Sequence, residues 1–395
     1  MKAREVCDGV HWVGAVDWDR RLFDSLFPIP EGTSYNSYLV RGSEGTALID
    51  TIEPHFADVL FARLDDLGVE RLDYVVANHA EQDHSGALPQ VLERFPDATV
   101  VCSPKARGML ADLLPLPEER FRGVADGEEI SLGDRTLRFV HFPWVHWPET
   151  MLTHVPELKT LFPCDLFGSH LASNRLVVDD VAEVRAAARL YYAQIMMPFR
   201  RMIARKLGAV EAMELDRICP SHGPVHGDPA GIVASYRGWI GDTVRNRVVL
   251  PYITMHESTR VMVDHLVDAL TDRNVRVERF NIENIEIGRL ASALVDAATV
   301  VVGTPTVLGG AHPNAVYAAL LANLLRPKLR FASVVGSYGW GGKAVDQVVG
   351  ALSNLDVDLL EPVLSRGTPD ADALAALERL ADDIATRHAE IGAID

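Results

Sequence analysis

The chain has 395 residues, of which 48% are apolar and 24% are charged, a composition that predicts two or three globular domains with ample core. Its net charge of -17 argues against nucleic acid and against an anionic membrane surface as partners. No apolar run reaches the roughly 18 to 20 residues that a membrane span needs, and the first residues lack an apolar signal region. We therefore expect a cytoplasmic protein.

The four cysteines are widely spaced, at Cys7, Cys102, Cys164 and Cys219. No two of them form a C-x-x-C pair, which excludes a rubredoxin-type or zinc-ribbon site. We expect buried free thiols, because an unpaired cysteine behaves as a small apolar side chain.

Short strands and turns are predicted for the first residues of the chain. Residues 38–40 and 46–50 flank the turn residues 42–45, which indicates a hairpin. Residues 56–67 then carry apolar side chains at helical spacing and stop at Gly68, which predicts a helix.

The stretch 78–86 lies between an apolar run at 72–77, which predicts a buried strand, and a helix expected to follow it. It contains four possible metal ligands, which are His79, Glu81, Asp83 and His84. In extended backbone the first three would point to one side and His84 to the other, so their convergence requires a turn. Carboxylates and imidazoles gathered at a strand end predict a metal site rather than ordinary surface residues.

The rest of the first half mixes strands with helices. Residues 99–102 indicate a strand, and residues 129–132 and 137–140 indicate a hairpin around Gly133 and Asp134. This mixture favours a layered α/β sandwich over a barrel. Residues 184–206 predict one long helix whose basic end is most simply a solvated face.

Three more candidate ligands each follow an apolar segment: His146, Asp165 and His222. His146 lies between two tryptophans and two prolines, and by itself it is better explained as a packing histidine. Asp165 ends an apolar strand, where an aspartate is either a helix N-cap or a ligand. Their order along the chain and their places after strands make the three together a candidate set.

Near residues 245–247 the pattern changes to alternating strands and helices. Strands are predicted at 248–253, 276–280, 299–303, 330–336 and near 359, and helices at 258–273, 314–325, 343–352 and 371–385. This alternation predicts a doubly wound parallel sheet. We place the domain boundary between residues 247 and 248.

Three segments after strands of the second domain suit a flat, phosphorylated ligand. They are Thr254, Met255, His256, Glu257, Ser258 and Thr259; then Pro305, Thr306, Val307, Leu308, Gly309 and Gly310; and last Ser337, Tyr338, Gly339, Trp340, Gly341 and Gly342. The first segment precedes a helix N-terminus and suits a phosphate, but it lacks the lysine of a nucleotide P-loop. Glycines and aromatic residues in the other two suit a ring. Because doubly wound sheets bind ligands at this edge, the segments predict a flavodoxin-like FMN site.

The H-x-E-x-D-H pattern of residues 79–84 resembles the loop of the metallo-β-lactamase superfamily, with Glu81 where the hydrolases usually carry histidine. A carboxylate is a harder donor than imidazole and moves the metal preference from zinc toward iron or manganese. Together with the FMN segments, this change resembles the flavodiiron proteins over essentially the whole chain. The resemblance implies a metallo-β-lactamase-like αββα sandwich with two irons at 1–247, followed by a flavodoxin-like FMN domain at 248–395.

The resemblance also implies a role for each candidate ligand. One iron would be held by His79, Glu81, His146 and a bridging Asp165, and the other by Asp83, His84, Asp165 and His222, with His84 either a ligand or a residue behind the ligands. Glu257 departs from the family pattern by placing a carboxylate in the phosphate segment, and we expect it to point to solvent. Trp147 and Tyr192 either line the pocket or pack in the core.

The function implied is that of an oxidoreductase that passes electrons from an external donor through FMN to a non-haem di-iron centre. That centre would reduce dioxygen to water, nitric oxide to nitrous oxide, or both. The donor would be rubredoxin, another flavoprotein or a reduced deazaflavin coenzyme, and Arg326, Lys328 and Arg330 are the candidate docking residues for an acidic donor. A head-to-tail homodimer would let the flavin of one subunit face the iron of the other.

Two other functions fit parts of the sequence. One is a zinc hydrolase of the metallo-β-lactamase type with a fused flavodoxin domain, which Glu81 disfavours. The other is a flavodoxin-like electron carrier with a degenerate first domain, which the complete set of candidate ligands disfavours.

Overall fold

The structure is a computed structural model that describes residues 1–177 and 181–394. The chain divides into two compact units. The first comprises Met1–Tyr192 with Phe199–Ile240, and the second comprises Ala193–Pro198 with the chain from Gly241 onward. None of the helices described is long and apolar enough to cross a membrane.

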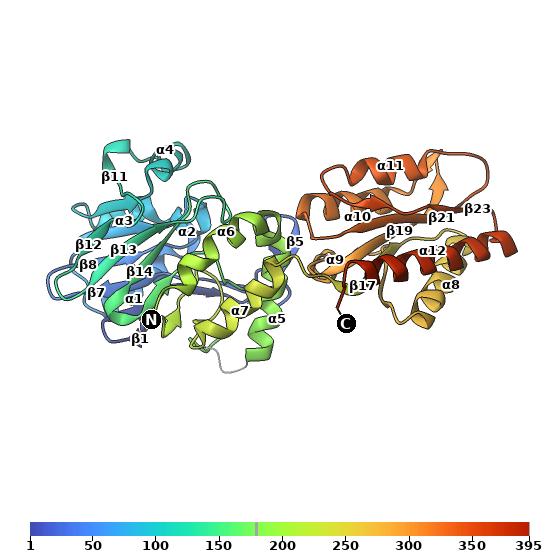
Figure 1. The fold of residues 1–395 in the computed structure, drawn as a ribbon. Helices are drawn as coiled ribbons and strands as arrows, with labels where there is room; N and C mark the ends of the chain where they lie inside the picture. The colour runs from blue at the N-terminus through green and yellow to red at the C-terminus, as the bar shows by residue number, and fades with distance from the viewer. Residues whose placement is uncertain (178–180, 395) are drawn as a thin grey trace. The chain divides into compact units, whose positions relative to one another are not determined.

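The first unit contains two main sheets with helices outside them (Figure 1). The seven-stranded sheet runs in the order β1 (Arg4–Cys7), β2 (Val10–Trp12), β7 (Tyr38–Arg41), β8 (Thr46–Ile49), β9 (Tyr74–Ala77), β10 (Thr99–Cys102) and β11 (Phe121–Gly123). The five-stranded sheet runs in the order β12 (Glu129–Ser131), β13 (Thr136–His141), β14 (Met151–Val155), β15 (Thr160–Phe162) and β16 (Arg217–Ile218). Two small hairpins pair β3 (Ala15–Asp17) with β6 (Thr33–Tyr35) and β4 (Leu22–Phe23) with β5 (Phe27–Pro28).

Alternating side chains of the first sheet build two separate cores. Leu48 and Val75 pack in the core that contains apolar residues of the helices α1 (Ala57–Asp66), α3 (Leu88–Arg94) and α4 (Pro104–Leu113). Their neighbours Ile49 and Val76 pack instead against Phe139 and other residues of the second sheet. Because successive side chains of a strand point to opposite faces, both faces of this sheet are covered. The predicted αββα sandwich is confirmed.

The long helix predicted at 184–206 is broken. The chain forms α5 (Val181–Tyr191), a π-helical turn (Tyr192–Met196), a 3-10 turn (Met197–Phe199) and then α6 (Arg200–Glu211), before α7 (Pro229–Ile240). Pro198 lies at the break, where it offers no backbone N–H and its ring obstructs a continuous helix. The helical periodicity on either side hid this interruption.

The second unit is a doubly wound parallel sheet, as predicted. Its strands run in the order β18 (Arg276–Asn281), β17 (Arg245–Tyr252), β19 (Ala297–Val307), β21 (Phe331–Tyr338) and β22 (Asp358–Leu359), with β20 (Gly310–Ala311) paired to β19 and β23 (Val363–Arg366) paired to β21. This order is that of flavodoxin-like sheets. In Figure 1, α10 (Pro313–Leu325) and α11 (Ala344–Ala351) lie on one face, and α8 (Ser258–Asp272) and α12 (Ala371–Glu390) lie on the other.

Three elements of the second unit were not predicted: α9 (Ile287–Leu294), β20 and β23. The strand β19 also runs four residues beyond its predicted end at 303, through Pro305 to Val307, because β20 turns back and pairs with it. Among the cysteines, Cys102, Cys164 and Cys219 are buried and unpaired as expected, whereas Cys7 is only partly buried.

His388 is a buried histidine that should make the stability of the second unit depend on pH. Its ring is buried, receives a hydrogen bond from the Thr299 hydroxyl at 2.7 Å and donates one to Asn246 Oδ1 at 2.9 Å. The Asn246 amide group in turn donates to Asn274 O, which assigns the proton of His388 to Nδ1. Burial lowers the pKa of His388 from 6.5 to about 4, because the charged ring would lose its hydration.

We predict that the second unit loses stability as the pH falls from 6.5 toward 4, because unfolded His388 takes up a proton that the folded side chain excludes. The loss would be at most about 1.4 kcal/mol per pH unit in that window. Native-state hydrogen exchange of the β19 amides, corrected for its intrinsic pH dependence, would measure it. The variant His388→Gln should lose this slope, and an equally steep slope in the variant would contradict the assignment.

Candidate metal centre and flavin-binding segments

The candidate ligands at 79–84 follow β9 and are turned by a single helical turn. Glu81 is extended, with φ -60 and ψ 142, and it caps α2 (Gln82–Ser85), which carries Asp83 and His84. This is the turn that convergence of the four side chains requires. Upstream, Asp50 accepts hydrogen bonds from both nitrogens of Asn78, at 2.7 and 2.9 Å, and so fixes the backbone just before His79.

The first group of ligand atoms comes from three separate segments. Atoms of His79, Glu81, His146 and Asp165 all lie within 4.8 Å of one another. The Oε2 atom of Glu81 is 3.2 Å from His79 Nε2 and 3.3 Å from His146 Nε2. The Oδ2 atom of Asp165 is 3.4 Å from His146 Nε2.

A second group lies on the other side of Asp165. Ligand atoms of Asp83, His84 and His222 lie within 4.8 Å of one another. The Oδ1 atom of Asp165 is 3.1 Å from His84 Nε2 and 3.4 Å from His222 Nε2. One carboxylate therefore presents Oδ2 to the first group and Oδ1 to the second, so Asp165 is the residue that would be shared if each group held a metal ion.

Several of the buried candidate ligand atoms have no hydrogen-bond partner among the residues described. Both carboxylate oxygens of Asp83, Asp165 Oδ2 and His222 Nε2 are buried and make no hydrogen bond within the described part of the chain. His222 Nε2 lies 3.1 Å from Asp83 Oδ2, but the angles do not make a hydrogen bond. Unsatisfied buried polar atoms are rare, so this donor set fits cations that would complete it.

The charges of the centre lead to the same conclusion. Burial alone would raise the pKa of Asp165, yet the surrounding imidazoles, His84 first, hold it well below its usual range. Burial likewise opposes protonation of the histidines, but the carboxylates raise the pKa of His79, His84 and His146 to about 10. The cluster therefore requires positive charge, which protons or metal ions can supply.

Residues behind the candidate ligands hold them in place. His79 Nδ1 donates to Glu149 Oε1 at 2.6 Å, which leaves Nε2 facing the centre. His222 Nδ1 donates to Ser34 O at 2.7 Å with the same consequence. Asp165 Oδ1 accepts hydrogen bonds from the hydroxyls of Tyr191 at 2.9 Å and Ser221 at 3.0 Å.

Sequence reasoning missed these supporting roles. Glu149 is a single glutamate three residues after His146, with no pattern to distinguish it, and it is 2% exposed. The Trp147 ring lies edge-on to His79 at 4.9 Å, beside the centre. Tyr192 packs against Tyr236 and Trp239, so core packing accounts for it.

The first of the three predicted FMN segments ends at the N-terminus of α8. Thr259 Oγ1 and Ser337 Oγ lie 3.0 Å apart, so the first and third segments meet. The Thr254 hydroxyl is buried and has no hydrogen-bond partner among the residues described. Hydroxyls gathered at a helix N-terminus, with one of them unsatisfied, fit a phosphate group.

Glu257 does not obstruct this place. It adopts the left-handed region, with φ 68, and caps α8 through its backbone without a side-chain hydrogen bond to the helix. Its carboxylate pairs with Arg260, and the side chain is 56% exposed. The expectation that Glu257 points to solvent agrees with this geometry.

The second segment is a hairpin and not the loop that the sequence suggested. Pro305 to Val307 belong to β19, Gly310 belongs to β20, and only Leu308 and Gly309 form the turn. Leu308 is 99% exposed. In the third segment, Ser337 and Tyr338 end β21, and Trp340 is 79% exposed between glycines.

The prediction that Arg326, Lys328 and Arg330 form a docking site for the donor is wrong for Lys328. Lys328 is 2% exposed and donates from Nζ to Gly241 O at 3.0 Å, so it cannot present its charge to a partner. Arg330 donates to Asp242 O, and Arg326 ends α10 in the left-handed region. The three basic residues look alike in the sequence, which gives no sign that the side chain of Lys328 is buried.

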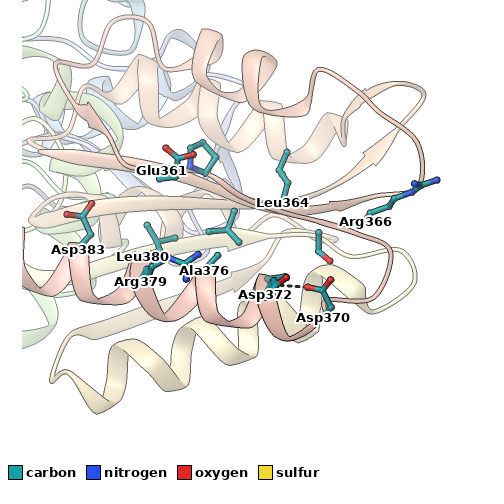
Figure 2. A pocket seen from close by; sticks show the side chains of 13 residues that line it. Glu361, Leu364, Arg366, Asp370, Asp372, Ala376, Arg379, Leu380 and Asp383 are labelled. Carbon is teal, nitrogen blue, oxygen red and sulfur yellow. Dashed lines mark hydrogen bonds between the residues drawn. The ribbon is translucent and has the colours of Figure 1, made fainter.

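A cavity of about 660 Å³ between β23 and α12 lies apart from the predicted flavin residues (Figure 2). Arg366, which lines the cavity, donates a hydrogen bond from Nε to Gly339 O of the third predicted FMN segment at 3.3 Å. Carboxylates such as Asp370, Asp372 and Asp383 line much of it. None of the predicted FMN-binding residues lines the cavity, so it is a separate feature of the second unit.

Comparisons with known proteins match the first unit in one case and nearly the whole chain in the others. A family model described as ODP family beta lactamase matches residues 33–223. The chain is 38% identical over 372 residues to the type A flavoprotein fprA of Rhodobacter capsulatus, covering 91% of this chain and 85% of that one. It is 37% identical over 348 residues to a nitric oxide reductase of Moorella thermoacetica, covering 86% of each. Among solved structures, the rubredoxin oxygen:oxidoreductase of Desulfovibrio gigas matches with a TM-score of 0.93 and 29% identity, covering 98% of both chains.

We predict that Glu149→Ala lowers the affinity of the centre for a divalent metal roughly ten- to a hundredfold, because His79 loses the acceptor that orients it. Glu149→Gln, which keeps an oxygen at that place, should lose less. Metal retention during competition with a chelator would measure both, and Glu119→Gln, at an exposed glutamate of the same unit, is the matched control. Retention by Glu149→Ala equal to that of the unmodified protein would contradict the supporting role.

Proposed function

The chain belongs to the flavodiiron, or type A flavoprotein, family, and on that premise we propose that it reduces dioxygen to water, nitric oxide to nitrous oxide, or both. Electrons would come from an external donor. The observation that carries the proposal is the pair of ligand groups that share Asp165. Two relatives support the range of substrates by their names, one a nitric oxide reductase and the other a rubredoxin oxygen:oxidoreductase.

In this proposal the candidate ligands divide between two irons. His79, Glu81, His146 and Asp165 would hold one, and Asp83, His84, Asp165 and His222 would hold the other. The 3.1 Å approach of His84 Nε2 to Asp165 supports a ligand role for His84. Three carboxylates against two divalent cations nearly balance the buried charge, and the oxygen-rich set favours iron over zinc.

FMN is the second group that the residues fit. Its phosphate would lie at the segment from Thr254 to Thr259, and its ring would lie against the segments 305–310 and 337–342. The unsatisfied Thr254 hydroxyl and the meeting of Thr259 with Ser337 support this arrangement. When bound, FMN and the two irons supply the transfer of electrons and the reduction of the gas.

The contribution of the chain itself is to position charge and exclude water. Asp165, His79 and His222 are each at most 1% exposed, so the ligand atoms act in a medium of low polarity. Glu149, Ser34 and Ser221 keep the imidazoles and the shared carboxylate in one orientation. A preorganised set of this kind binds two cations without rearrangement.

The partner and the compartment are also part of the proposal. The donor is rubredoxin, another flavoprotein or a reduced deazaflavin coenzyme, and the name of the Desulfovibrio gigas relative favours the first. The protein works in the cytoplasm as a head-to-tail homodimer. A two-fold axis would supply each contact between flavin and iron twice.

We predict that the anaerobically reduced protein consumes dioxygen or nitric oxide in stoichiometric amounts, whereas the Asp165→Ala variant does not, because it lacks the shared carboxylate. The variant should keep its FMN, since the flavin segments belong to the other unit. Mixing the reduced protein with each gas in turn and following consumption directly would test this. Consumption of neither gas by unmodified protein loaded with flavin and iron would overturn the proposed function.

We predict two irons per chain and little zinc in protein produced with iron available, because carboxylates supply three of the ligands. Elemental analysis of the purified protein measures the ratio directly. Two tightly held zinc ions, with no activity restored by iron, would favour the alternative of a metallo-β-lactamase-type zinc hydrolase with a fused flavodoxin domain.

We predict that two defective subunits restore activity when they are mixed. One partner would be the Asp165→Ala variant, which keeps FMN, and the other would be flavin-free protein that keeps iron. Activity should return upon subunit exchange, because the flavin of one chain would serve the iron of the other. Full activity of the unmodified protein at dilutions where it is a monomer would contradict this arrangement.

A further inference from the structure

The second FMN segment is a tight hairpin that receives little support from its own side chains. Its turn residues Leu308 and Gly309 both have positive φ, 52 and 79, which is the backbone of a type I′ turn. Leucine is disfavoured in that region because its Cβ approaches the following carbonyl. Leu308 is 99% exposed, so no packing of its side chain compensates for the strain.

The hairpin is held instead from α11. Gln347 Oε1 accepts a hydrogen bond from Ala311 N at 2.8 Å, and Lys343 N, at the start of the same helix, donates to Gly309 O at 3.1 Å. Ala311 is 7% exposed, so its N–H would lose its acceptor in a nearly buried place if Gln347 were removed. Gln347 itself is exposed, and its side chain contacts the hairpin from the surface.

The glycine at position 310 is shaped for this contact. A Cβ added to Gly310 would lie 2.3 Å from Gln347 Oε1 and 2.8 Å from both Cδ and Nε2 of the same side chain. All three of its nearest atoms belong to Gln347, so the bare backbone is what lets the glutamine approach. A Cβ on Gly342 would lie 2.7 Å from Thr306 Cγ2, so the third FMN segment also abuts this hairpin.

We propose that Gln347 is a positioning residue for the flavin, which latches the 305–310 hairpin to α11 and presents it to the ring of FMN. The inference rests on the proposed FMN site and assigns a role to a residue outside its three segments. Without the latch, the strained turn would sample other conformations, and flavin binding would have to restore the bound one. The loss should therefore appear as weaker FMN binding in a protein that remains folded.

The test is FMN titration of the flavin-free full-length chain, followed by flavin fluorescence. Gln347→Ala should raise the Kd for FMN about tenfold, the equivalent of one hydrogen bond, whereas Gln347→Glu should stay within about threefold because its carboxylate still accepts from Ala311 N. Gly310→Ala should weaken binding by displacing Gln347, and it should add little in the Gln347→Ala background. Gln90→Ala, at a glutamine of the first unit, is the matched control and should leave the Kd unchanged.

A second measurement requires no flavin. Exchange of the Ala311 amide hydrogen in the flavin-free chain should accelerate in Gln347→Ala and not in Gln347→Glu. If the unmodified chain binds FMN and Gln347→Ala binds it as tightly, or if Gln90→Ala weakens binding equally, the latch is overturned. If the unmodified chain does not bind FMN at all, the proposed FMN site fails, and the exchange rates alone decide whether the latch exists.

Discussion

The central constraint on the first unit is a buried cluster of negatively charged carboxylates, whose charge must be neutralised by nearby positive charge. Glu81, Asp83 and Asp165 lie close together within the unit, and burying ionised carboxylates is costly unless cations neutralise them. The imidazoles around them are drawn toward the protonated state for the same reason. The pair of divalent metal ions that we propose would satisfy this requirement with the ligand atoms already in place.

The αββα sandwich brings the candidate ligands together at one place in the first unit. Covering both faces of the first sheet buries Val75, Val76 and Ala77 of β9, so the turn that follows starts from a well-packed strand end. His146, Asp165 and His222 lie on segments distant in the sequence, and the fold brings them to the end of that strand. Glu149 then accepts a hydrogen bond from His79, and Tyr191 and Ser221 donate hydrogen bonds to Asp165, which restricts these side chains further.

The second unit differs from the first, because the proposed FMN site needs exposed backbone at an open sheet edge, whereas the proposed metal centre needs burial. Its three segments lie at the carboxyl ends of β17, β19 and β21, where parallel strands leave an edge for a ligand. Two residues of these segments, Leu308 and Glu257, have a positive φ and therefore a strained backbone. Contacts from neighbouring elements hold these segments, and the Gln347 hydrogen bond to the hairpin is one of them.

The sequence by itself determined the fold class, the two-part organisation and the spacing of residues 79–84, because periodicity and short motifs are local properties. Glu81 in place of histidine is the basis for predicting iron rather than zinc. Only the tertiary structure decided which oxygen of Asp165 faces which ligand group, that Glu149 supports His79, and that Lys328 is buried. The break at Pro198 and the hairpin at residues 305–310 are local features of the chain. The other three outcomes depend on contacts between segments far apart in the chain, which no local pattern encodes.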